Sequence, residues 1–184
     1  YFITMINMSC MIEKDTVIQI NTDYGSIYFK LFIKEAPITW NNFLKYIDKH
    51  RYKDFHFYRT VVMSNQPKNN IKIEVIQGGL GFEEHLMELP PILHETTDIT
   101  GLKHLDGTLS MARIEPGSAS SEVFICVNNQ PELDYGGKRN IDGQGFAAFG
   151  KVIKGLSVVR LIHSSPQKDQ FLNKIVKVNY IKRM

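Results

Sequence analysis

The feature that most constrains the fold is a series of short β-strand patterns interrupted by only two helical patterns. The strand patterns are rich in β-branched and aromatic residues and are bounded by turn residues. They cover residues 17–21, 26–32, 55–61, 73–77, 108–112, 122–127, 146–152 and 175–181. The regular strand–helix alternation of a parallel sheet is absent. We therefore expect a mainly β fold, a closed eight-stranded antiparallel barrel capped by two α-helices, because closure leaves no strand edge exposed.

The two helical patterns indicate where a ligand can bind. One follows Pro37 and ends near His50, and the other follows Gly155; in both, apolar residues recur at helical spacing. If each helix buries its apolar side against one mouth of the barrel, a ligand has to bind on the outer wall. The stretches 62–72 and 80–107 are longer than ordinary connections, and we expect them to lie beside such a site and shape it.

Composition places the chain among ordinary globular proteins. Its 184 residues fit one domain, expected at 15–184 after an irregular leader at 1–14. The net charge of +3 and the scattered lysines and arginines give no reason to expect a nucleic-acid partner. The six histidines show no close ligand spacing, so a metal site is not expected. No apolar run approaches the roughly 20 residues that span a bilayer.

The first ten residues allow two interpretations. Tyr1–Cys10 is either the end of an export signal near a lipid-modifiable cysteine or a disordered leader. We expect a location outside the cytoplasm, in the periplasm or cell envelope, with the cytoplasm as the alternative. Cys10 and Cys126 lack CxxC spacing and are expected to be free thiols rather than a disulfide.

An arginine inside a strand pattern is the first candidate functional residue. Arg59 lies in the segment Phe57-Tyr58-Arg59-Thr60-Val61, and Gln77, followed by two glycines, ends the next strand pattern. A permanent positive charge among apolar side chains costs free energy unless something uses it. Arg59 is therefore either the polar group of a binding site lined by hydrophobic side chains or a strand arginine held in a structural salt bridge.

Several motifs in a fixed order give the chain a resemblance to a known family. They are Tyr28–Phe32, Ala36-Pro37 with Asn42-Phe43, Phe57-Tyr58-Arg59, Ile76-Gln77-Gly78-Gly79, Gly107–Ala112, Ser121–Ile125, Leu133-Asp134 and Ala148–Val152. Each motif is weak alone, but their order and spacing are specific together and span about 17–181. The chain resembles the cyclophilin-type peptidyl-prolyl cis-trans isomerases, and more specifically a bacterial subgroup with an enlarged loop after the arginine strand.

This resemblance implies a full set of site residues. It gives catalytic roles to Arg59 and Gln77 and places Phe124 at the base of a pocket for the proline ring. The other substrate-binding positions that it implies are Val75, Leu133, Ala112, Arg113, Glu122, Phe146 and Val123. It also implies that the partners are proline-containing polypeptides and that no cofactor is needed. The polar character of the sequence favours a monomer.

Four positions depart from the family pattern. Val123 replaces an aromatic residue, which would loosen the proline pocket, and Phe146 replaces the histidine of many members. Tyr58 also replaces a histidine, and strand alternation predicts that its side chain points away from the site. Glu132 stands where cyclosporin-sensitive members have a tryptophan, so we expect weak or no cyclosporin binding.

The implied activity is consistent with the chemistry of an arginine beside apolar side chains. Rotation about an X-Pro bond faces a barrier of about 20 kcal/mol from amide resonance. A rigid charged donor such as Arg59 matches the twisted amide better than either planar form. We therefore expect a peptidyl-prolyl cis-trans isomerase that assists protein folding. The alternatives are a proline-peptide-binding or chaperone module with little turnover, which Val123 and Phe146 favour, and a purely structural barrel.

Overall fold

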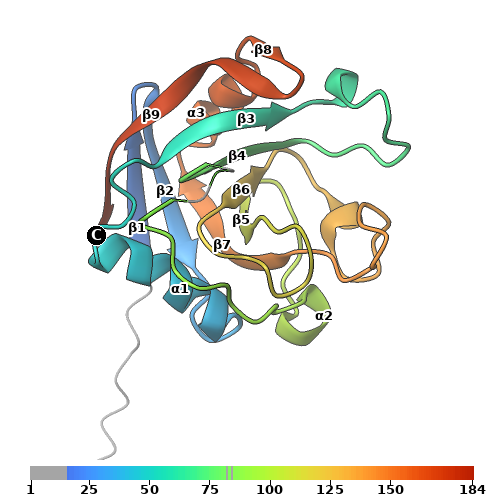
Figure 1. The fold of residues 1–184 in the computed structure, drawn as a ribbon, viewed down its shortest axis with the longest axis horizontal. Coiled ribbons are helices and arrows are strands. Elements are labelled where there is room, and N and C mark those ends of the chain that lie inside the picture. Colours follow the sequence, from blue (N-terminus) through green and yellow to red (C-terminus); the bar gives the residue numbers. More distant parts are fainter. Residues whose placement is uncertain (1–15, 82, 84) are drawn as a thin grey trace, which may run out of the picture.

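Eight antiparallel strands close into a barrel (Figure 1). The computed structural model describes residues 16–81, 83 and 85–184, and within them the strand order is β1-β2-β7-β5-β6-β4-β3-β9, with β9 also pairing with β1. The bounds are β1 Val17–Thr22, β2 Gly25–Leu31, β3 His56–Val61, β4 Val75–Gly79, β5 Thr108–Met111, β6 Val123–Cys126, β7 Ala147–Lys154 and β9 Phe171–Arg183. A two-residue strand, β8 (Gln167–Lys168), pairs with β9. The predicted closed eight-stranded barrel is confirmed.

Two helices pack against the barrel, α1 (Pro37–Asp48) below it and α3 (Leu156–His163) above and behind it in the view of Figure 1. Proline suits the first turn of α1 because its missing N–H would have no helical partner there. The same turn is capped from far along the chain, since the Glu95 carboxylate accepts hydrogen bonds from the backbone amides of Ile38 and Thr39. The negative charge also complements the helix dipole. Both predicted helices are present.

Three further helical turns lie in the connections between strands. They are α2 (Thr97–Thr100), η1 (Met63–Asn65) and η2 (Pro131–Leu133). Each has at most four residues, which is too short for a helical period to appear in the sequence. The long stretches 62–72 and 80–107 are therefore only partly irregular.

Alternate residues of the strands supply two separate apolar clusters. The larger cluster fills the barrel and includes the fully buried Phe29, Phe57 and Phe149 together with side chains of both α1 and α3. The smaller cluster consists of Val61, Ile73, Val75, Phe124, Cys126 and Leu133. In β6, Val123 belongs to the larger cluster and Phe124 to the smaller, as strand alternation requires. Because side chains fill the interior, the outer wall is where a ligand can bind.

Several expectations concern residues that lie outside the described ones. The leader at 1–14, its boundary with the domain and the export signal near Cys10 all fall within residues 1–15.

Of the two cysteines, Cys126 is described by the structure and is a buried free thiol. Among the described residues, no helix is long and apolar enough to cross a membrane. In that same part of the chain, no group of three or more His, Cys, Asp or Glu side chains could hold a metal ion.

Candidate active site

A β-bulge in β3 brings two adjacent side chains to the same face of the barrel wall. Phe57 pairs with Gly78 and Arg59 with Gln77, so Tyr58 is an extra residue opposite a continuous partner strand. A bulge of this kind interrupts strand alternation. The prediction that Tyr58 points away from the site is therefore wrong, because its hydroxyl accepts a hydrogen bond of 2.9 Å from the Gln77 amide nitrogen.

The guanidinium of Arg59 is held from two sides. Its Nη1 donates to Gln77 Oε1 at 2.7 Å, and both Nε (3.1 Å) and Nη2 donate to Gln170 Oε1. Gln170 is itself fixed, since its Nε2 donates to the Asn65 carbonyl at 3.1 Å. Burial lowers the pKa of Arg59 below its ordinary value, but a guanidinium stays charged at any physiological pH. Gln170, in the turn before β9, was not predicted, because nothing in its local sequence connects it with a strand 111 positions away.

A chain of hydrogen bonds fixes the orientation of the Gln77 amide. The Tyr58 hydroxyl donates to Glu122 Oε2 at 2.5 Å, so its oxygen can only accept from the amide nitrogen of Gln77. The amide oxygen of Gln77 must then face Arg59. Burial raises the pKa of Tyr58 well above its ordinary value, which keeps the hydroxyl protonated as a donor. The carboxylate at the end of the chain accepts a further bond of 2.9 Å from the backbone amide of Gly81.

Burial also makes the stability of the protein depend on the ionisation of Glu122. Burial raises the pKa of Glu122, so the folded protein holds this proton more tightly than the unfolded chain does. The free energy of unfolding should therefore fall as pH rises from the ordinary glutamate value through the raised one. In Glu122→Gln this contribution is absent, so the stability of the variant relative to the wild type should increase with pH across that window. Urea unfolding of both proteins from pH 4 to pH 7 measures the difference, and a difference that stays constant or falls would contradict the assignment.

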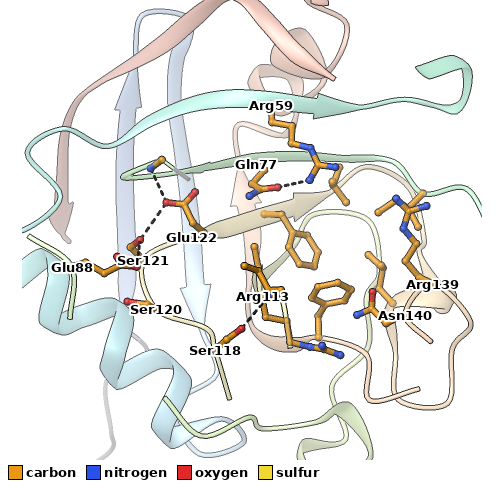
Figure 2. Close-up of a pocket in the computed structure, with 18 of the residues that line it drawn as sticks. Arg59, Gln77, Glu88, Arg113, Ser118, Ser120, Ser121, Glu122, Arg139 and Asn140 are labelled. Atoms are coloured by element: carbon orange, nitrogen blue, oxygen red, sulfur yellow. Dashed lines mark hydrogen bonds between the residues drawn. The ribbon is translucent and has the colours of Figure 1, made fainter. Parts of the chain in front are cut away.

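A cavity of about 400 Å³ lies on the outer wall and gathers nearly all the predicted site residues. We call it the outer-wall groove. The predicted residues that line it are Arg59, Gln77, Phe124, Val75, Leu133, Ala112, Arg113, Glu122 and Phe146. Figure 2 shows Arg59 and Gln77 joined at one wall, with Glu122, Ser121 and Glu88 on one side of the groove and Arg139 and Asn140 on the other. All the residues implied by the resemblance except Val123 therefore share one site.

The apolar floor of the groove is a set of packed rings. Phe124 meets the edge of Phe146 at a centroid distance of 5.2 Å and stacks on His104 at 5.9 Å. His104 cannot turn, because its ring nitrogens contact Asp134 Oδ1 at 2.8 Å and Ser110 Oγ at 3.0 Å. The Phe124 ring is thus clamped, and only 4% of the residue is exposed. A rigid apolar floor suits a compact apolar ring such as that of proline.

Val123 is the one predicted site residue that does not line the groove. It belongs to the large cluster inside the barrel and is 1% exposed. Its neighbour Phe124 occupies the outward position of β6, so Val123 cannot occupy it as well. The valine therefore changes the volume of the barrel interior, and its placement gives no support to a loosened proline pocket.

Arg113 forms the rim of the groove and anchors a neighbouring loop. Its guanidinium makes two hydrogen bonds with the Asp142 carboxylate and one of 2.8 Å with the Gly145 carbonyl. It also lies over the Phe146 ring, 5.2 Å from the centroid. The side chain is 1% exposed, so its charge is already paired and covered. This arrangement holds Phe146 in the groove wall.

The stretch 62–72 lies beside the groove, as predicted. Gln66, which is 1% exposed, anchors it by donating to the carbonyls of Val62 and Ile73. Its side-chain oxygen accepts a bond of 3.0 Å from Arg139, a groove-lining residue. The stretch 62–72 therefore positions Arg139, a side chain that belongs to the connection between β6 and β7.

Comparison with known proteins identifies the family. Residues 17–183 match the family described as cyclophilin type peptidyl-prolyl cis-trans isomerase/CLD. The chain is 35% identical to a peptidyl-prolyl cis-trans isomerase of Acinetobacter baylyi, with 83% of this chain and 74% of that protein covered. It is 34% identical to peptidyl-prolyl cis-trans isomerase B of Escherichia coli, over 78% and 81% of the two chains. The chain therefore belongs to the cyclophilin-type peptidyl-prolyl cis-trans isomerase family.

Solved structures agree on the fold. A cyclophilin type peptidyl-prolyl cis-trans isomerase from Cryptosporidium parvum superposes with a TM-score of 0.72 at 24% identity, covering 92% of this chain and 98% of that one. A second structure of that protein, in the presence of the dipeptide Ala-Pro, superposes with a TM-score of 0.69 at 25% identity, covering 90% and 96%. The barrel and its helices are thus those of the family.

Proposed function

We propose that the outer-wall groove catalyses cis-trans isomerisation of X-Pro bonds in polypeptide substrates. The observation that carries the proposal is a rigidly held guanidinium, that of Arg59, in the wall of a groove with an apolar floor. The structure supports this role over that of a salt-bridging strand arginine, because among the described residues no carboxylate forms an ion pair with Arg59. Family membership, shown over 17–183, agrees with it.

The mechanism depends on where the charge is aimed. Twisting the X-Pro amide ends its resonance and localises a lone pair on the prolyl nitrogen. The bonds to Gln77 and Gln170 use three of the five N–H groups of Arg59, which leaves one on each terminal nitrogen for the substrate. A donor that is already oriented stabilises the twisted state without reorganisation at the moment of rotation. Phe124 and its neighbours hold the proline ring while the preceding residue turns.

The required stabilisation is within reach of such a site. An acceleration of about 10⁵-fold corresponds to roughly 7 kcal/mol of preferential binding of the twisted state. A single preorganised donor contributes about 3–4 kcal/mol in other enzymes. Positioning of the ring and exclusion of water from the guanidinium supply the remainder. No covalent intermediate is needed, because the reaction is a rotation about one bond.

Exchange spectroscopy on a proline tetrapeptide tests the proposal directly. The wild-type protein should add cross-peaks between cis and trans resonances at a mixing time at which the free peptide shows none, because uncatalysed exchange takes tens to hundreds of seconds. If the protein changes the chemical shifts of the peptide without enhancing cis-trans exchange, it is instead a proline-peptide-binding module. Of the two residues that favoured that alternative, only Phe146 lies in the groove.

We also propose that cyclosporin binds weakly or not at all. Glu132 occupies the position where a tryptophan is expected in sensitive members, and its carboxylate accepts a hydrogen bond of 2.8 Å from the Lys138 backbone amide. A charged side chain tied to a loop offers no apolar surface to an apolar cyclic peptide. Calorimetric titration should give a dissociation constant above the micromolar range. The proline tetrapeptide, titrated into the same sample, serves as the control for an intact groove, and submicromolar cyclosporin binding would refute the proposal.

A further inference from the structure

The two sides of the outer-wall groove carry opposite charges. Glu122 and Glu88 line one side, and Arg139, with its neighbour Asn140, lines the other (Figure 2). Arg59 lies between them on the upper wall in this view. A polypeptide that crosses the groove therefore meets a negative potential on one side of its proline and a positive potential on the other. Such an arrangement distinguishes substrates by the charge of the residues near the proline.

Arg139 is held in place before any substrate arrives. Its Nη1 donates to Gln66 Oε1 at 3.0 Å and to the Ile71 carbonyl at 2.6 Å. Both partners belong to the stretch 62–72, and Gln66 is itself buried and anchored by two hydrogen bonds. The side chain of Arg139 is half-buried. Little conformational entropy remains to be lost when a ligand binds to it, so the side chain is preorganised.

The charge of Arg139 is not balanced by any carboxylate of the described residues. Within 16–81, 83 and 85–184, no carboxylate lies within 4.0 Å of its nitrogens. Arg59, which also lines the groove, is cationic as well. The pKa of Arg59 is lowered mainly by burial, and repulsion from the guanidinium of Arg139 lowers it further. Arg113 differs from both, because Asp142 already neutralises it. Two groove cations, Arg59 and Arg139, therefore lack a carboxylate partner among the described residues, a condition that an anionic ligand would relieve.

We propose that Arg139 and Asn140 form a subsite for the carboxylate of an acidic residue close to the substrate proline. In the part of the chain that the structure describes, only Nη1 of the Arg139 guanidinium donates to protein acceptors, so its Nε and Nη2 groups can form the paired bonds that a carboxylate accepts from a guanidinium. The Asn140 amide, which lines the same side, is a further donor. The inference rests on the proposed function, since it names a substrate preference of the same groove. Because the opposite side carries Glu88 and Glu122, the preference must be confined to one side of the proline.

Matched blocked peptides test this subsite. In acetyl-Ala-Xaa-Ala-Pro-Ala-Zaa-Ala-amide, glutamate is compared with glutamine at Xaa and, separately, at Zaa, so that only charge changes. At one of the two positions, the glutamate peptide should have a kcat/KM about tenfold higher than that of the glutamine peptide. This factor corresponds to about 1.4 kcal/mol. The advantage should shrink at high salt, because a partly exposed charge pair is screened. A peptide with a free terminal carboxylate near that position distinguishes a side-chain preference from a chain-end preference.

Variants of Arg139 test whether this residue causes the preference for glutamate over glutamine. In Arg139→Gln the glutamate-to-glutamine ratio should fall to about one, whatever the absolute rate, while Arg139→Lys should keep part of it because the charge remains. Arg160→Gln is the matched control, since Arg160 pairs with Asp106 away from the groove and its loss should leave the ratio unchanged. Amide NMR spectra verify that each variant is folded.

The outcomes separate this inference from the proposed function. If the wild type catalyses exchange but the ratio is within twofold of one at both positions, or if Arg139→Gln keeps the ratio, the subsite is refuted and the isomerase activity stands. If the wild type catalyses no exchange, the proposed function fails. Dissociation constants from NMR titration of the same peptide pairs then test the subsite alone. At one of the two positions the glutamate peptide should bind about tenfold more tightly than the glutamine peptide.

Discussion

Replacing Arg59 with alanine should lower catalysed exchange by about 10²–10³-fold while leaving the protein folded. The variant removes the guanidinium that we propose stabilises the charge developing on the prolyl nitrogen. Arg59→Lys should lose most of the activity as well, because one ammonium nitrogen lacks the planar fork whose separate nitrogens reach Gln77 and Gln170. Exchange rates at matched enzyme concentrations measure the effect.

Peptide binding and stability distinguish this result from simple damage. The apolar floor around Phe124 remains in Arg59→Ala, so the dissociation constant of the proline peptide should change by only a few-fold. Arg160→Ala, remote from the groove, should leave exchange unaffected. If Arg59→Ala retained more than a tenth of the wild-type rate, electrostatic stabilisation by this guanidinium would not be the main contribution.

The second large effect is expected at the floor of the groove. Phe124→Ala removes a ring that packs against both Phe146 and His104 and should lower kcat/KM by about 100-fold through weaker binding of the proline ring. The free energy of unfolding should fall by about 3 kcal/mol, at the low end for Phe→Ala, because the ring belongs to the smaller cluster rather than to the barrel interior.

A pair of milder substitutions separates binding from stability. Phe124→Leu and Phe149→Leu make the same chemical change, one in the groove and the other inside the barrel. Both should destabilise the protein, but only Phe124→Leu should raise KM for a proline peptide. Equal KM values for the two variants would show that Phe124 supports the fold without contacting the substrate.

Local patterns in the sequence were sufficient to predict the barrel, since each strand carries its own alternation of apolar residues and each long helix its own period. The predictions failed where the structure depends on register or on distant contacts. The bulge at Tyr58 shifts one side chain to the other face, and no residue type there signals it. Gln170 reaches Arg59 only because β9 pairs with β3. The resemblance supplied the position of Val123 but not the side of the strand on which it lies.

The pairing of β9 with both β1 and β3 has a consequence for synthesis of the protein. As the chain leaves the ribosome, the first and third strands have exposed edges until the last strand emerges. Contacts between segments so far apart in sequence form slowly. Gln170, which orients the Arg59 side chain, immediately precedes β9 and is translated after all the other barrel strands. A nascent chain can therefore build much of its groove, yet it becomes an active folding catalyst only when its own folding is complete.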